Sequence, residues 1–202
     1  MKNITVVRDY KSGGSGLLRE IRPSELHKYR FENVSESSNG FGFNFFNHDA
    51  AKVNECILVP GLMRCIGIAF HVLPKNSPGE APSTIGYHIN PLRHGSKRCE
   101  YYAKHFLKSV HMLLERHTIP AMYVAGGRLN KASDKYLYEQ TLNLLIHPIP
   151  YVLPDIKIVR FETFEGTEAT LLTLSRTRAS ALRQMRDGKL RHSTVQLSPF
   201  VI

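Results

Sequence analysis

The chain has few cysteines, a shortage of acidic residues and no long apolar run. Its three cysteines are an odd number without metal-ligand spacing, so we expect reduced thiols. No apolar run approaches the ~18 residues that cross a bilayer, and the first residues lack the apolar core of a signal peptide. We therefore expect no membrane partner, and either a cytoplasmic protein or one exported without a classical signal peptide into a host cell.

The shortage of acidic residues gives the chain a net charge of +10, which favours acidic partners. Residues 175–186 are predicted to form a basic helix with a thin apolar stripe. It is either a solvated helix at the domain edge, a docking site for an acidic protein, or a nucleic-acid site, which the lack of interleaved aromatic residues disfavours. The arginines proposed to dock are Arg176, Arg178, Arg183 and Arg186.

Apolar periodicity indicates a mixed α/β domain. Apolar residues at helical spacing predict helices over residues 99–117 and 133–146. We expect strands at residues 4–8, 41–46 and 121–125, hairpins over 57–72 and 156–174, and a long loop over 74–98. The predicted division is a loosely structured extension over 1–40, a catalytic domain over 41–174, and a basic C-terminal helix and tail over 175–202.

The stretch NECILVPGLMRCIGIAFHVLPK places a thiol and an imidazole in two apolar runs. If the hairpin turn spans residues 62–65, Cys56 lies opposite His71, with Cβ atoms ~5 Å apart. An imidazole at that distance favours the nucleophilic thiolate. The alternative is that both residues fill the core, because free cysteine is among the most buried residue types.

The spacing of Cys56 and His71, with Leu73-Pro74 just beyond, resembles the chemotaxis-receptor glutamine deamidases of the CheD family. Tyr102-Ala103 at the start of a helix and the sequence YVAGG at the end of a strand continue the resemblance, which spans roughly residues 50–174. Cytotoxic necrotizing factor toxins share the same Cys–His core. The chain departs from the CheD pattern at Val53-Asn54-Glu55, where the family has Leu-Gly-Ser, and at Ala50, where it has threonine.

The resemblance implies an α+β fold with mixed β-sheets in a sandwich flanked by helices, in a single domain. It also implies a protein-glutamine deamidase in which Cys56 is the nucleophile and His71 the base. Asn54 is the candidate third catalytic member, and Asp49, Thr84 or a backbone carbonyl are alternatives. No metal or organic cofactor is expected. A transglutaminase, a catalytically inactive module of the same fold that binds an acidic protein, and a basic nucleic-acid-binding domain remain alternatives.

A second histidine pair lies in the long loop, where His88 and His94 flank Arg93. A metal site would need a third ligand and closer spacing, so contact with a substrate is the better interpretation.

Overall fold

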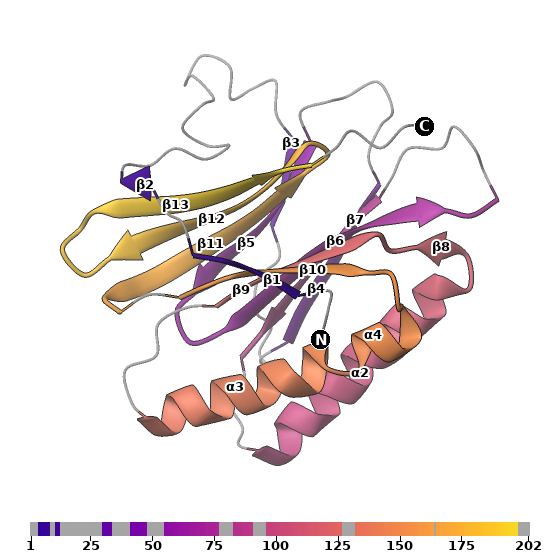
Figure 1. Ribbon diagram of the computed structural model, residues 1–202, viewed down its shortest axis with the longest axis horizontal. Coiled ribbons are helices and arrows are strands. Elements are labelled where there is room, and N and C mark those ends of the chain that lie inside the picture. The colour runs from indigo at the N-terminus through magenta and orange to yellow at the C-terminus, as the bar shows by residue number, and fades with distance from the viewer. Residues whose placement is uncertain are drawn as a thin grey trace.

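Three layers make up the computed structural model: a helical layer, a seven-stranded sheet and a six-stranded sheet (Figure 1). The fold is therefore mixed α+β, as the sequence predicts. No helix in the part of the chain that the structure describes is long and apolar enough to cross a membrane. The structure describes residues 4–8, 11–12, 30–33, 41–47, 55–76, 83–90, 96–126, 132–163 and 165–197.

The first sheet combines a parallel part with an antiparallel part. Strands β1, β10 and β9 run parallel, and β9, β6, β7 and β4 pair antiparallel, while β8 pairs with the end of β6. The strand bounds, in spatial order, are β1 Ile4–Val7, β10 Lys157–Phe161, β9 Ala121–Gly126, β6 Ile66–Pro74, β7 Ser83–Ile89 and β4 Phe41–Asn47, with β8 at His117–Thr118.

The second sheet is antiparallel except where β3 joins β5 in parallel. Its strands, in spatial order, are β2 Lys11–Ser12, β13 Leu190–Gln196, β12 Arg178–Met185, β11 Thr167–Ser175, β5 Glu55–Leu62 and β3 Arg30–Asn33.

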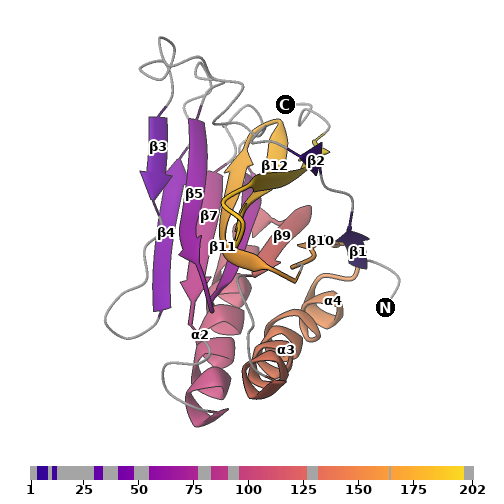
Figure 2. The same cartoon turned by 90° about the vertical axis from the view of Figure 1, so that its left-hand side faces the viewer.

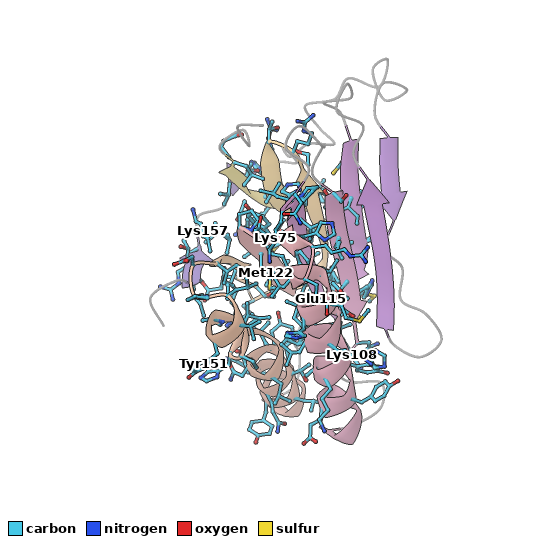
Figure 3. All side chains as sticks on the ribbon, turned by 90° about the vertical axis from the view of Figure 1, so that its right-hand side faces the viewer. Lys75, Lys108, Glu115, Met122, Tyr151 and Lys157 are labelled. Atoms are coloured by element: carbon cyan, nitrogen blue, oxygen red, sulfur yellow. The ribbon has the colours of Figure 1, made fainter. Side chains whose placement is uncertain are left out.

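The helices pack on the face of the first sheet that is turned away from the second sheet (Figure 2). They are α2 Ser96–Leu114, α3 Ala132–Ile146 and the short α4 Ile149–Val152. Figure 3 shows Met122 of β9 inside the molecule, whereas Lys108 and Tyr151 lie on the outer surface of the helical layer. The helices thus cover one side of the sandwich rather than flanking both.

Two apolar clusters hold the layers together. One lies between the helices and the first sheet and includes Phe70, Phe106 and Leu142. The other lies between the two sheets and includes Ile57 and Leu174. Strand β6 contributes to both clusters, and its near-continuous apolar sequence is typical of a strand buried on both faces.

The predicted hairpin over residues 57–72 is wrong, because β5 and β6 belong to different sheets. Both edges of β6 are already paired, with β7 and β9, so β5 pairs with β11 and β3 instead. Pro60-Gly61 is not the turn. Val59 and Leu62 pair with residues only two apart on β11, so Pro60-Gly61 lies in a β-bulge, where Gly61 has a positive φ of 66°.

The predicted hairpin over residues 156–174 fails for the same reason: β10 lies in the first sheet and β11 in the second. The chain crosses between the sheets at Glu165-Gly166. The predicted loop over 74–98 contains β7, which pairs with β6 and β4.

The two terminal regions also differ from expectation. Residues 178–185 form strand β12 instead of a helix, because burial follows period two, with Ala179 and Ala181 in the inter-sheet cluster. Gly188, with φ 77°, occupies the turn to β13. Within residues 1–40, β1, β2 and β3 pair into the sheets, so the described parts of this segment belong to the sandwich.

The predictions for the strands at 4–8, 41–46 and 121–125 and for the helices at 99–117 and 133–146 are confirmed within a few residues at each end.

Candidate functional site

Cys56 is the second residue of β5 and lies between two partner strands. It pairs with Ser175 of β11 on one side and with Phe31 of β3 on the other. Its side chain is fully buried, and its Sγ donates a weak hydrogen bond to the carbonyl oxygen of Ile57 at 3.4 Å. Burial raises the pKa of the Cys56 thiol to about 12. In this conformation the thiol is therefore protonated at neutral pH.

His71 lies near the end of β6 and is also buried. Its Nε2 is 3.0 Å from the carbonyl oxygen of Ser175. Because a carbonyl oxygen can only accept, Nε2 carries a proton and donates. Nδ1 is 3.1 Å from the hydroxyl of Thr84, which lies directly opposite His71 on β7. In the neutral ring, Nδ1 accepts from that hydroxyl and is the nitrogen that carries the basic lone pair.

Ser175 connects the two candidate residues. It is the last residue of β11, where it pairs with Cys56, and directly paired Cα atoms are ~5 Å apart. Its hydroxyl donates to the Arg178 carbonyl at 3.2 Å and accepts from the Arg178 N–H at 3.1 Å. Ser175 thus closes the tight turn into β12 and does not begin the predicted helix over residues 175–186. The turn and the strand pairing together fix the carbonyl that holds the His71 ring.

The third catalytic position has two candidates within the structure. Thr84 and the Ser175 carbonyl both orient the His71 ring, one at each nitrogen. Asn54 and Asp49 lie outside the described residues. The sequence offers no signal for the Ser175 carbonyl, because every residue has one and only the fold selects this one.

Of the second histidine pair, only His88 lies within the described residues. His88 lies within β7 and is buried, so it is part of a strand and not of a loop, while His94 and Arg93 are outside the described residues. Within the described ranges, no three His, Cys, Asp or Glu side chains are grouped so that they could hold a metal ion.

The basic C-terminal arginines do not form one exposed face. Arg183 is buried, and its Nη2 donates to the carbonyl of Glu162 at 2.6 Å. Arg186 is exposed and pairs with Glu168 at 3.2 Å, while Arg176 and Arg178 are half-buried. Of these four arginines, Arg183 is not accessible to a docking partner in this structure.

The hydroxyl of Thr84 has a testable energetic role. Thr84→Val keeps the shape of the side chain but leaves the buried Nδ1 of His71 without this donor, so we expect the free energy of unfolding to fall by about 1–3 kcal/mol. Thr170→Val is the matched control, because Thr170 is equally buried and its Oγ1 has no partner in the described structure. Urea unfolding should show a near-neutral or stabilising effect for the control. Equal effects of the two variants would contradict this role.

Comparison of the chain with protein-family models and with curated proteins found no match.

Proposed function

We propose that this protein is a cysteine-dependent protein-glutamine deamidase with a CheD-like site, in which Cys56 is the nucleophile and His71 the general base. The observation that carries the proposal is the position of Ser175. Its carbonyl fixes the tautomer of His71, and its backbone pairs with Cys56. With Nε2 donating to a backbone carbonyl, the basic lone pair of the neutral ring lies on Nδ1, which must exchange its hydrogen bond from the Thr84 hydroxyl for the proton of a thiol, as a cysteine–histidine pair requires.

The fold supports the same proposal. A sandwich of mixed sheets with helices on one face agrees with the architecture that the resemblance implies. Tyr102 and Ala103 face the core from α2, and the first four residues of the sequence YVAGG end β9, in the order of elements that carries the resemblance.

The reaction would proceed by acyl transfer. His71 Nδ1 takes the proton of Cys56, and the thiolate attacks the carboxamide carbon of a glutamine side chain. The imidazolium then gives its proton to the departing ammonia as the tetrahedral intermediate collapses to a thioester. Water, deprotonated by His71, cleaves the thioester and leaves glutamate and the free thiol. An amine in place of this water would give a transglutaminase product.

Catalysis requires the thiol to leave its buried position. With a pKa of about 12 in the closed conformation, Cys56 is a thiolate in only about one molecule in 10⁴ to 10⁵ at pH 7.5. Binding of a substrate must therefore expose the Cys56 end of β5 and turn Sγ toward Nδ1 of His71. The expected substrate is a surface glutamine of a protein, in the same cell or, for an exported effector, in a host cell.

Alkylation measures this opening. Without substrate, iodoacetamide should modify Cys56 at pH 7.5 at least ~100-fold more slowly than a free thiol, because burial raises its pKa and excludes the reagent. The rate should rise with pH above neutrality, since the thiolate fraction of Cys56 grows as the pH increases toward its raised pKa. A substrate protein should accelerate labelling of Cys56 and not of Cys65, measured by peptide mass spectrometry. Fast, substrate-independent labelling of Cys56 would contradict the closed state.

A second candidate function is that of a catalytically inactive module of the same fold that binds an acidic protein. The observation that favours it is the orientation of Cys56. Ile57 and Val59 point into the inter-sheet cluster, so strand alternation turns Cys56 to the opposite face of β5, whereas His71 shares its face with Ala69 of that cluster. Incubation of candidate proteins with wild type and Cys56→Ala separates the two functions, since only the deamidase gives a Cys56-dependent mass change.

A further inference from the structure

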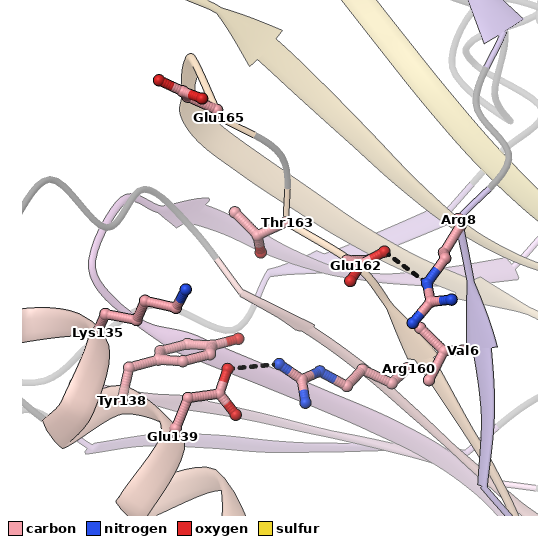
Figure 4. Close-up of a pocket in the computed structure, with 9 residues that line it drawn as sticks. All are labelled: Val6, Arg8, Lys135, Tyr138, Glu139, Arg160, Glu162, Thr163 and Glu165. Atoms are coloured by element: carbon pink, nitrogen blue, oxygen red, sulfur yellow. Dashed lines mark hydrogen bonds and ion pairs between the residues drawn. The ribbon is translucent and has the colours of Figure 1, made fainter. Parts of the chain in front are cut away.

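A polar pocket of about 610 Å³ lies at the carboxyl ends of β1 and β10, beside the first turns of α3 (Figure 4). The crevice outside the carboxyl ends of parallel strands is a common ligand site in sheets with crossover helices. The volume falls within the ~300–1,000 Å³ of small-molecule sites. The pocket therefore has both the location and the size of a site for a small ligand.

Two ion pairs form its walls. Arg8, just after β1, pairs with Glu162, just after β10, at 3.0 Å. Arg160 of β10 pairs with Glu139 of α3 at 2.7 Å. Each pair joins segments that are distant in sequence. Because a guanidinium has five donors and a carboxylate has two acceptor oxygens, each pair leaves hydrogen-bonding groups available to a ligand.

Two further charges of opposite sign line the same pocket. Lys135 extends from α3 into it, and Glu165 lies on the turn that leads to β11 (Figure 4). Both side chains are exposed, and neither has an ion-pair partner among the residues that the structure describes. The pocket thus presents one unpaired cation and one unpaired anion beside two balanced pairs.

Tyr138 and Thr163 form an uncharged inner wall of the pocket, held in place by contacts with Gly126. Burial raises the pKa of the Tyr138 hydroxyl to about 12, so that it stays protonated. Its ring packs against Gly126, at which any side chain would collide with the Tyr138 hydroxyl. Thr163, also in the pocket, donates to the Gly126 carbonyl at 3.2 Å. This rigid wall therefore bounds the pocket without adding charge to it.

We propose that the pocket binds a zwitterionic small molecule of the α-amino-acid class. The pocket residues include three cations and three carboxylates (Arg8, Lys135, Arg160, Glu139, Glu162 and Glu165). The carboxylates of the pocket would repel a purely anionic ligand, and its guanidinium groups would repel a purely cationic one. A zwitterion can place its carboxylate by Lys135 and its ammonium by Glu165, so that each unpaired charge gains an opposite partner.

This site is separate from the candidate catalytic site, so the inference goes beyond the proposed function. Glu165 lies two residues before the start of β11 and Ser175 ends the strand, and the nine residues of β11 span ~26 Å. An amino acid in the pocket would therefore not be the group that Cys56 attacks.

Calorimetric titration of the full chain tests the proposal. L-alanine, L-glutamine, L-glutamate and L-lysine are the probes. N-acetyl-L-alanine, which lacks the ammonium, and L-alaninamide, which lacks the carboxylate, are the matched controls. We expect at least one free amino acid to bind, and removal of either charge from L-alanine to weaken its binding about tenfold or more. The proposal is overturned if no amino acid binds, if the acetylated probe binds as well as L-alanine, or if inorganic phosphate binds more tightly than every amino acid.

Variants assign the binding to this pocket. Lys135→Gln and Glu165→Gln should each weaken binding about tenfold, and since both positions are exposed, the fold should be retained, as checked by urea unfolding. Lys157→Gln, at the opposite end of β10, is the matched control and should bind as wild type does. Equal affinities in all three variants would place the amino acid elsewhere and refute the assignment.

Discussion

Replacement of Cys56 with alanine is expected to abolish glutamine deamidation, by at least ~10³-fold, because the thiolate forms the covalent intermediate and no other group in the site can replace it. The measurement is intact and peptide mass spectrometry of candidate protein substrates, in which exchange of NH₂ for OH adds about one dalton. His71→Gln should have an effect of similar size, since Cys56 in the buried form is protonated and needs a base.

Cys65→Ala is the matched control for Cys56→Ala. Cys65 is also buried, in the inter-sheet cluster, but on the far side of the β5 bulge from Ser175. Its loss should change stability and leave the modification rate near that of wild type. If both cysteine variants lost activity equally, the loss would be structural. If Cys56→Ala modified the substrate as fast as wild type does, Cys56 would not be the nucleophile, and the binding-module function would remain.

The sequence predicted elements better than it predicted their partners. The helices α2 and α3 and the strand β9 follow from periodicity and turn residues, because burial of one face leaves a pattern within a single segment. Strand pairing leaves no such pattern. Pro60-Gly61 has the composition of a turn and is a bulge within β5, since β6 is already paired on both edges.

Contacts between distant segments also escaped prediction in the C-terminal segment and in the candidate site. In RASALRQM the apolar residues Ala179, Leu182 and Met185 recur at helical spacing, but the structure buries Ala179 and Ala181 at strand spacing. Cys56 and His71 were found from residue type and spacing, whereas the Ser175 carbonyl that holds the ring lies 104 residues from His71. Contacts made by a backbone group at that separation are set by topology alone.

Arg183 also contacts backbone groups that are distant in sequence. Among the arginines of residues 175–186, replacement of Arg183 should cause the largest loss of stability. The Arg183 side chain is buried, and it lies on the same face of β12 as Ala179 and Ala181 of the inter-sheet cluster. Its Nη2 donates to the Glu162 carbonyl, after β10 of the first sheet, and its Nη1 donates to Ser193 Oγ and to the Ala181 carbonyl, at 3.2 and 3.3 Å. Burial lowers the pKa of Arg183 to about 10, so the side chain remains charged at neutral pH.

Arg183→Met should therefore lower the free energy of unfolding by about 2–4 kcal/mol, measured by urea denaturation at pH 7, because methionine fills much of the space but leaves buried acceptors unpaired. Arg186→Met, at the residue that follows the same strand, is the matched control. Its ion pair with Glu168 is solvent-exposed, with side-chain exposures of 67% and 28%, so its loss should cost less than about 1 kcal/mol. Arg183→Lys should also destabilise the protein, since a single ammonium group cannot reproduce a fork that reaches three acceptors. Equal stabilities of Arg183→Met and Arg186→Met would show that the sheets are held together by the inter-sheet apolar cluster without this arginine.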